Sequence, residues 1–321
     1  MPMKTVTVVV PTYNEEENIG AVVTRLQAIF EKELSRYRLE ILFVDDGSTD
    51  GTVPLIRSYA RQYPEQVKAI LNATNFGYVR NIFYALQQAG GDCAFLLHAD
   101  LQNPPELIPE FIRHWEAGSP VVIGIKNKSR ENPVLYLIRS LYYKLMKRIA
   151  DVPHLKHFTE FELLDRSFLD VLRKMKDPYP YLRGIIAEYS GHIQIVYYTQ
   201  DKRRNGKSKF GFWKYYDFAM LGITSYTSRP IRLIMLLGVF LLLCSGVGLA
   251  FLLFYQLFYL KAFRFGALEL AVVMGFLSAL HTLCLGILGE YILFSSRRGM
   301  MRPIVIERER LNFDGPEETD A

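Results

Sequence analysis

The sequence predicts an α/β domain with a mainly parallel sheet, followed by two long apolar helices. In the first 200 residues, short runs rich in β-branched side chains alternate with helical stretches, which is typical of strand–helix–strand units. Beyond residue 230, the segments 233–260 and 270–289 contain no charged residue. These two features divide the chain into an N-terminal α/β domain and an apolar C-terminal part.

Each element of the domain is predicted from a local pattern. Strands are expected at the short apolar runs Thr5–Val10, Leu39–Val44, Val67–Leu71, Ala94–Leu97 and Val121–Ile125. Helices are expected between them, at Glu15–Glu31, Thr52–Tyr63 and Tyr78–Gln88. The pattern predicts a Rossmann-like domain over residues 1–210. Ligands of such a domain bind beyond the carboxyl ends of its strands.

The composition of the chain limits its function. It has 321 residues, enough for one large domain or two modest ones. Hydrophobic residues make up 50% and charged residues 22%, a balance that excludes a disordered chain. A net charge of +5 fits an anionic surface or a phosphorylated substrate, and it is too small to indicate nucleic acid. The three cysteines, Cys93, Cys244 and Cys284, offer neither a disulfide framework nor zinc spacing, so we expect a reducing compartment.

The two uncharged segments predict a transmembrane hairpin, with spans over 231–260 and 267–296, because each is long enough to cross a bilayer. Two buried helices of a soluble protein are the alternative. Basic residues at both outer ends favour a cytoplasmic location for the two termini and the N-terminal domain. The aromatic-rich segment 211–229 is expected to form an amphipathic helix at the membrane surface, or a core helix of the domain. Residues 297–321 are expected to form a loose cytosolic tail.

Polar side chains follow the first two predicted strands. Tyr13 could stack on a nucleobase, and Glu15 could accept hydrogen bonds from a base or a ribose. Asp45 and Asp46 come directly after the second strand, where carboxylates would repel a phosphate but could accept from ribose hydroxyls. A turn capped by Asp50 is the simpler interpretation of this segment, but it does not explain the adjacent pair of acids.

A second polar cluster follows the fourth predicted strand. His98, Asp100 and Gln102 bring an imidazole, a carboxylate and an amide oxygen within five residues. With a diphosphate in reach, such a set could hold a hard cation, because Mg²⁺ and Mn²⁺ complete their coordination with phosphate oxygens and water. An ordinary loop before a Pro-Pro helix start is the alternative.

The segment 202–209 is strongly basic and lies just before the apolar part. Arginine can bind a phosphate with two hydrogen bonds and lysine as a point charge, so this segment could hold a phosphorylated acceptor. A solvated loop or an anionic-lipid patch would explain the same charges. Arg130, in a polar stretch after the fifth strand, could also contact phosphate.

The order of these motifs resembles one known family. The runs VVPTYNEEENI, VDDGSTDGT, NFG and HADLQNPPELI, followed by FELLDR and RRNGKSKF, are similar to those of family 2 glycosyltransferases with the GT-A fold. With the expected hairpin, they resemble the polyprenyl-phosphate branch of that family. This branch includes the dolichol-phosphate mannose synthases and bacterial undecaprenyl-phosphate glycosyltransferases.

The resemblance implies a role for individual residues. It implies a nucleoside site formed by Pro11, Tyr13, Glu15, Asp45, Asp46 and Ala99. It implies a metal site for Mg²⁺ or Mn²⁺ formed by His98, Asp100 and Gln102. It implies catalytic roles for Asp100, Glu160 and Arg203, and an acceptor-phosphate site formed by Arg203, Ser208, Lys209 and Arg130.

The sequence departs from the family pattern at four positions in these motifs. His98 replaces the first aspartate of the metal motif, and Asn103 replaces the aspartate before the two prolines. Tyr78 stands near the place of a lysine that usually opens the following helix, with Arg80 as a possible substitute. Glu160 replaces the aspartate of a Gly-Asp-Phe segment, which keeps a carboxylate on a longer arm. These departures put the metal site in doubt.

The resemblance implies inverting transfer of a sugar from a nucleotide diphosphate sugar, with UDP-hexose as the first expectation, to undecaprenyl phosphate. The lipid-linked product would serve cell-envelope glycan modification. The resemblance also implies a homo-oligomer and a multi-pass protein of the bacterial inner membrane. One alternative is a degenerate nucleotide-sugar binder that acts as a subunit. Another is a transferase with a saccharide or protein acceptor.

Overall fold

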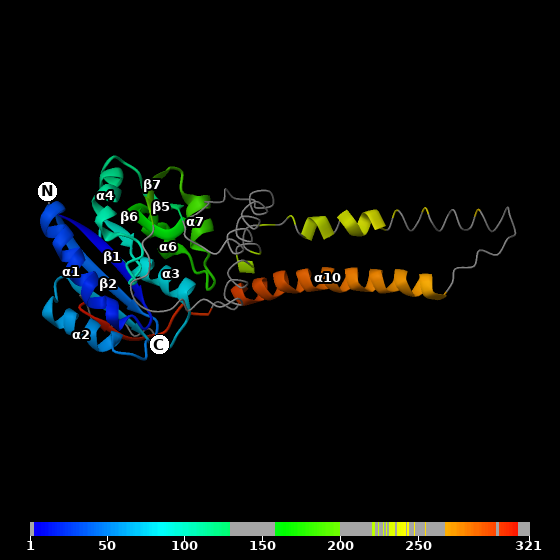
Figure 1. Cartoon of the computed structure of the whole chain (residues 1–321), viewed down its shortest axis with the longest axis horizontal. Coiled ribbons are helices and arrows are strands. Elements are labelled where there is room, and N and C mark those ends of the chain that lie inside the picture. The colour runs from blue at the N-terminus through cyan, green and yellow to red at the C-terminus, as the bar shows by residue number, and fades with distance from the viewer. Residues whose placement is uncertain are drawn as a thin grey trace.

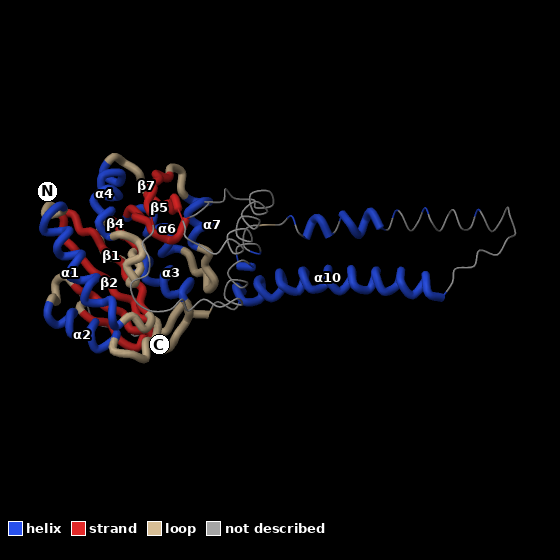
Figure 2. The backbone as a smooth tube through the Cα atoms, viewed as in Figure 1, coloured by secondary structure: helices blue, strands red, loops and turns tan. Residues whose placement is uncertain are grey.

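The computed structural model describes residues 3–128, 158–199, 267–299 and 302–313, together with isolated positions and short stretches between 220 and 254. Its described strands form one eight-stranded sheet with helices on both faces (Figure 1). The long helix α10 (Ala267–Gly299) extends away from this sheet, as Figure 2 also shows. The chain therefore contains an α/β unit and a projecting helix.

The strand order of the sheet is β7-β5-β6-β4-β1-β2-β3-β8. The strands are β1 (Lys4–Thr12), β2 (Tyr37–Asp45), β3 (Val67–Asn72), β4 (Cys93–Leu96), β5 (Val121–Lys128), β6 (Phe158–Asp165), β7 (Ile193–Thr199) and β8 (Glu307–Leu311). The first four strands are parallel to one another, and β5 is parallel to β7. By contrast, β6 runs antiparallel to β4 and β5, and β8 runs antiparallel to β3. The sheet is thus mixed and mainly parallel.

Two hydrophobic cores cover the two faces of the sheet. Val6, Val8 and Val10 of β1 face one core, and Val9 faces the other. Strands that are buried on both faces are expected to be almost entirely apolar, which explains the sequence of β1. The first core includes residues of α1 (Glu16–Glu33), α2 (Thr52–Gln62) and α4 (Ile108–Glu116), which follows the 3-10 turn η1 (Pro105–Leu107). The second core includes residues of α3 (Tyr78–Gln88), α6 (Arg166–Lys174) and α7 (Leu182–Tyr189).

The structure confirms the five predicted strands and the three predicted helices. The tertiary structure adds β6, β7 and β8, which the sequence patterns did not predict as strands. The tail predicted to be loose beyond residue 297 is therefore ordered in part, because β8 pairs with the edge strand β3. Arg57 of α2 forms an ion pair with Glu309, and Tyr84 of α3 donates a hydrogen bond to Glu307. The C-terminal segment is thereby joined to the α/β unit.

The predicted multi-pass membrane placement and its transmembrane hairpin are contradicted. Among the described residues, no helix combines the length and the apolar character needed to cross a membrane. The first expected span, 231–260, is described only in part, so it includes no continuous described helix of that length. The second falls within α10, whose 33 residues include His281 and Glu290. Of the expected amphipathic helix, 211–219 lies outside the described residues and the remainder is described only at isolated positions.

Asn312 at the end of β8 provides a test of this C-terminal attachment. Its side chain donates hydrogen bonds to the carbonyl oxygens of Ala60 and Val67, at 2.7 and 2.8 Å, and its φ is 63°. We expect Asn312→Ala to lower the free energy of unfolding by about 1–3 kcal/mol, because it removes both donors and disfavours this backbone conformation. Urea unfolding of the full chain measures the change.

Two further variants separate the causes. Asn312→Gly removes the donors but keeps the backbone conformation accessible, so its effect should be smaller than that of alanine. Arg308→Ala, at an exposed position of β8, should leave the stability unchanged. Equal stability of Asn312→Ala and the parent chain would show that β8 is not held by these bonds.

Candidate active site

The carboxyl ends of β1, β2 and β4 meet at one edge of the sheet. β1 lies between β2 and β4, and all three strands run in the same direction. The chain order reverses at this point, since β2 continues on one side of β1 and β4 on the other. In open α/β sheets, ligands bind in the crevice at such a switch point. The loops after these three strands contain the predicted nucleoside and metal residues.

Asp45, at the end of β2, is fully buried and shapes its own loop. Its carboxylate accepts hydrogen bonds from the backbone N–H of Ser48, at 2.9 Å, and from the hydroxyl of Thr12, at 3.1 Å. The Ser48 hydroxyl also donates to it. Asp45 therefore holds the turn after β2 against the end of β1, and its oxygens are used within the protein.

Asp46 points into the loop between β3 and α3. Its carboxylate accepts from the backbone N–H groups of Phe76, at 2.8 Å, and Gly77, at 2.9 Å, and from the side chain of Asn72, at 3.3 Å. Burial raises the pKa of Asp46, and these hydrogen bonds oppose the rise. Gly77 has a φ of 94°, a conformation that favours glycine. Asp46 therefore joins the end of β2 to the start of α3.

The loop after β1 presents one aromatic ring at the surface. Tyr13 is 36% exposed, whereas Pro11 lies within β1 and pairs with Val44. Asn14 adopts a φ of 54° and accepts from the backbone N–H of Thr49 at 2.8 Å, which holds the β1 and β2 loops together. The Glu15 carboxylate accepts from Asn18 at 2.7 Å. Tyr13 is thus the best placed of the predicted nucleoside residues to stack on a base.

Asp46 can be tested by removing its acceptor oxygens. We expect Asp46→Ala to lower the free energy of unfolding by about 1–3 kcal/mol, because the N–H groups of Phe76 and Gly77 lose their partners. Asp46→Asn keeps one acceptor oxygen and should cost less. Thermal or urea unfolding measures both variants. An alanine variant with unchanged stability and no nucleotide binding would instead assign Asp46 a direct ligand contact.

The loop after β4 contains the predicted metal residues. His98 and Asp100 are half-buried, and the intervening Ala99 is buried. Asp100 accepts a hydrogen bond from the backbone N–H of Gln102 at 3.2 Å, and Leu101 adopts a φ of 53°. This tight turn brings the side chains on either side of Ala99 to the same edge of the sheet as the loop after β1.

The structure gives a reason for Asn103, one of the departures from the family pattern. Asn103 is buried and accepts a hydrogen bond from the hydroxyl of Tyr198, on β7, at 2.8 Å. A neutral amide suits this buried position, because a charged carboxylate would have to lose its hydration there. Arg80, the suggested substitute for a lysine, instead donates to the carbonyl of Pro178 at 2.9 Å and covers the ring of Tyr179.

Glu160 lies in a cluster that joins β6, α3, α7 and the β4 loop. Arg183 of α7 forms an ion pair with its carboxylate at 3.0 Å, and the hydroxyl of Tyr78 donates to the other carboxylate oxygen. The ring of Tyr78 stacks on His98, with centroids 5.8 Å apart and planes inclined by 14°. Burial and the neighbouring charge of Glu160 raise the pKa of Tyr78 well above its usual value, so its hydroxyl keeps its proton. Arg183 was not among the predicted site residues, because it lies in none of the sequence motifs.

Glu162 lies two residues further along β6 and is fully buried. Among the residues that the structure describes, neither of its carboxylate oxygens has a hydrogen-bond partner. Burial raises the pKa of Glu162 well above its usual value, and the charge of Glu160 adds to the rise. Because an isolated buried carboxylate is very costly, the neutral acid is the form expected in the folded protein.

The raised pKa of Glu162 predicts how stability depends on pH. The folded protein holds this proton more tightly than the unfolded chain, so the stability contribution is present at low pH and is lost as the pH rises. Glu162→Gln keeps the shape and removes the titration. At about pH 4 we expect the variant and the parent to have similar unfolding temperatures. Towards about pH 8 the unfolding temperature of the variant should increasingly exceed that of the parent. Thermal unfolding across this range measures the difference.

Glu40 provides the matched control. It is also buried, but it accepts from Thr7 at 2.7 Å and pairs with Lys68 at 2.8 Å. Glu40→Gln should therefore destabilise the protein, because Lys68 loses its partner. If the difference in unfolding temperature between Glu162→Gln and the parent stays constant with pH, the pKa of Glu162 does not change on folding.

The loop after β4 could supply only part of a cation's coordination. Among the described residues, no group of three or more histidine, cysteine or acidic side chains is arranged to hold a metal ion. His98, Asp100 and Gln102 nonetheless offer a nitrogen and oxygen donors on one turn. A hard cation that takes few protein ligands and fills its shell with phosphate oxygens and water fits this set. The metal would then depend on a bound diphosphate.

Four predicted acceptor residues cannot be placed. The structure does not describe the positions of Arg130, Arg203, Ser208 and Lys209.

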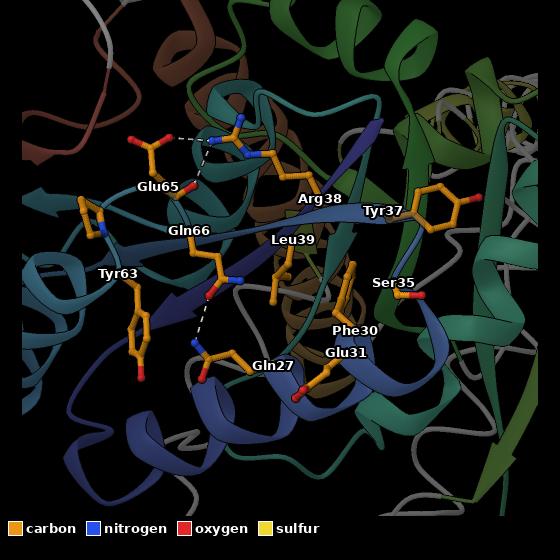
Figure 3. A pocket seen from close by; sticks show the side chains of 11 residues that line it. Gln27, Phe30, Glu31, Ser35, Tyr37, Arg38, Leu39, Tyr63, Glu65 and Gln66 are labelled. Atoms are coloured by element: carbon orange, nitrogen blue, oxygen red, sulfur yellow. Dashed lines mark hydrogen bonds and ion pairs between the residues drawn. The ribbon is translucent and has the colours of Figure 1, made fainter. Parts of the chain in front are cut away.

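A pocket of 730 Å³ lies elsewhere, between the end of α1 and the starts of β2 and β3 (Figure 3). Gln27 donates to Gln66 beside it, at 2.9 Å. Because this pocket lies at the amino ends of these strands, it is separate from the site at their carboxyl ends.

A parallel α/β sheet with polar loops at its switch point has the arrangement of a nucleotide-binding enzyme. The chain matches the model of the family described as "Glycosyl transferase family 2" over residues 7–174. It therefore belongs to this family, is a glycosyltransferase and has the GT-A fold.

Three relatives are similar over most of the chain. The chain is 32% identical over 290 residues to the Bacillus subtilis (strain 168) glycosyltransferase YkcC, which is described as uncharacterized, covering 89% of this chain and 87% of that protein. It is 30% identical over 288 residues to the bactoprenol glucosyl transferase of Shigella phage SfV, covering 89% and 92%. It is also 30% identical over 288 residues to the prophage bactoprenol glucosyl transferase homolog of Escherichia coli (strain K12), covering 89% and 93%.

Proposed function

We propose that this glycosyltransferase moves a hexosyl group from a nucleotide diphosphate sugar, with UDP-hexose as the first candidate, to polyprenyl phosphate. The observation that carries the proposal is the convergence of Tyr13, His98 and Asp100 at one edge of the sheet, from the loops after the neighbouring strands β1 and β4. The similarity to bactoprenol glucosyl transferases over 89% of the chain supports a polyprenyl acceptor. Undecaprenyl phosphate is the acceptor to test first, and the product would serve glycan modification of the cell envelope.

In this proposal, the loops after β1 and β2 bind the nucleoside. Tyr13 stacks on the base, and Glu15 accepts from the base or ribose. Pro11 and Ala99 form the backbone walls, while Asp45 and Asp46 hold the loops in place through their hydrogen bonds to Thr12, Ser48, Phe76 and Gly77. The two acids thus act on the shape of the site.

The diphosphate lies against the loop after β4. His98, Asp100 and Gln102 would hold Mg²⁺ or Mn²⁺ together with the diphosphate oxygens, and a bound cation would neutralise the charge that builds up on the leaving group. The backbone N–H of Gln102 donates to the carboxylate of Asp100 and so orients it. Glu160 pairs with Arg183 and accepts from Tyr78, whose ring stacks on His98.

The acceptor phosphate attacks the anomeric carbon of the sugar. One of its oxygens forms the new bond to this carbon as the bond to the diphosphate breaks, which inverts the configuration. A phosphate monoester has its second pKa near 6, so it is largely a dianion at neutral pH and needs no strong general base. Arg203, Ser208 and Lys209, with Arg130, are proposed to hold this phosphate, because arginine and lysine suit phosphate recognition. We also propose that copies of this chain associate as a homo-oligomer.

The proposal predicts a lipid product that depends on Asp100. We expect the purified full chain to transfer radiolabelled sugar from one member of a panel of nucleotide sugars to undecaprenyl phosphate, in the presence of Mg²⁺ or Mn²⁺. Asp100→Ala should lower the rate by at least about 10²-fold, a loss typical of removing a group that stabilises transition-state charge. Chromatography of the labelled lipid measures the transfer.

Asp170→Ala is the control, because Asp170 lies on the surface of α6 and pairs with Arg173. It should keep the parent rate. Nucleotide-sugar binding with no lipid product would favour the degenerate binder. Label on a saccharide or protein, with none on the lipid, would favour a different acceptor.

A further inference from the structure

Helix α3 contains two tyrosines with the same kind of partners. Tyr78 donates to Glu160, which pairs with Arg183. Tyr84, six residues further along the helix, donates to Glu307, which pairs with Arg310. The second group joins α3 to the C-terminal strand β8. The group around Tyr78 lies beside the loop after β4. In this group, unlike in the described group around Tyr84, the tyrosine ring stacks on a histidine, His98.

The contacts of Tyr78 reach both sides of the candidate site. Its ring stacks on His98, and its hydroxyl lies 3.4 Å from the Nε2 atom of that imidazole. The same hydroxyl donates to Glu160, whose backbone adopts a φ of 55°, an unfavourable conformation for a residue with a side chain. A strained backbone persists only where other contacts favour it, and here the Glu160 carboxylate contacts Tyr78 and Arg183.

Three of the departures from the family pattern come together in this cluster. His98, Tyr78 and Glu160 are far apart in the sequence, but each touches another of the three. An imidazole is larger than a carboxylate and presents its nitrogens in the plane of its ring, so a neighbour that fixes this plane also fixes where the nitrogens point. A tyrosine provides this, because it stacks through its ring and is anchored through its hydroxyl.

We propose that Tyr78 is a positioning residue that fixes the imidazole of His98 towards the diphosphate of the donor, and that Glu160 and Arg183 fix Tyr78 in turn. This inference rests on the proposed function in one respect, since it takes a nucleoside diphosphate as the ligand. It names the residues that hold a histidine in place at this site. The replacement of an aspartate by His98 is then compensated by Tyr78, and the site stays competent for binding.

The inference predicts that Tyr78 and His98 act together in ligand binding. The probes are UDP, GDP and CDP, each with Mn²⁺, and the affinity is measured by calorimetry and by the electron paramagnetic resonance signal of free Mn²⁺. Tyr78→Leu should weaken the binding of the preferred nucleotide and Mn²⁺ by about 2- to 10-fold, the range expected for one aromatic pair. Tyr78→Phe keeps the stack and should retain part of that affinity.

Tyr84→Phe is the matched control on the same helix. It also removes a hydroxyl that donates to a glutamate paired with an arginine, but it does so at the attachment of β8. It should lower the unfolding temperature and leave nucleotide and Mn²⁺ affinity unchanged. Equal losses of affinity in Tyr78→Phe and Tyr84→Phe would reduce Tyr78 to a structural residue and overturn the inference.

A double-mutant cycle decides whether Tyr78 acts through His98. In the His98→Asp background there is no imidazole to position, so Tyr78→Leu should cost much less affinity there than in the parent chain. Additive losses would overturn the inference, and so would absence of binding for all three nucleotides with Mn²⁺. Binding that follows the cycle without transfer to undecaprenyl phosphate would refute the proposed function alone. Transfer that is unaffected by Tyr78→Leu would refute the inference alone.

Discussion

The parallel pairing of β1 with both β2 and β4 is the constraint on which the rest of the structure depends. Because β1 has a parallel neighbour on each side, the loops after all three strands leave the sheet at the same edge. The register brings Thr12 opposite Asp45, and the N–H of Leu97 bonds to the carbonyl of Val9. Residues that are distant in sequence thereby become the walls of one site. The helices on both faces supply the apolar cover that this buried pairing requires.

The buried acids of this chain differ in what surrounds them, and the difference assigns their roles. Asp45 and Asp46 accept several hydrogen bonds and hold neighbouring loops together. Glu160 is balanced by an arginine and a tyrosine hydroxyl. Glu162 forms no hydrogen bond to any described residue, and a buried group of this kind is expected to be the neutral acid. Two carboxyl groups two residues apart on β6 therefore differ in their surroundings, because only Glu160 forms a described ion pair with Arg183.

The cluster around Tyr78 is the basis of our proposal that the site tolerates a histidine at position 98. The change from a carboxylate to an imidazole at position 98 alters the size, the charge and the donor atoms of the side chain together. A single substitution of that kind would leave the ring loosely held. Stacking on Tyr78, which is anchored by Glu160 and Arg183, restores one orientation. The result is a site in which four different elements, α3, β4, β6 and α7, determine the placement of one side chain.

Much of the fold and part of the site could be predicted from the sequence. The apolar β-branched runs and the intervening helical patterns determine β1 to β5 and α1 to α3, because periodicity is a local property of the chain. The positions of the polar motifs relative to β1, β2 and β4 likewise placed Tyr13, Asp46 and Asp100 at the carboxyl edge of the sheet, and their roles in binding stay predictions. The long uncharged segments, however, led to a membrane hairpin that the described residues do not support.

Only the tertiary structure decided the remaining features. The β8 strand is short and highly charged, with the sequence ERERL, so its place in the sheet depends on the free edge of β3 and on partners in α2 and α3. Arg183 belongs to no sequence motif, and Tyr78 was noted only as a departure from the family pattern. Their contacts with Glu160 and His98 arise because α7 and α3 bring them there. The raised pKa of Glu162 follows from its burial, with no hydrogen-bond partner within the described part of the chain, and burial is a property of the packed structure. Local patterns determine which elements form, and contacts between distant elements determine which side chains act together.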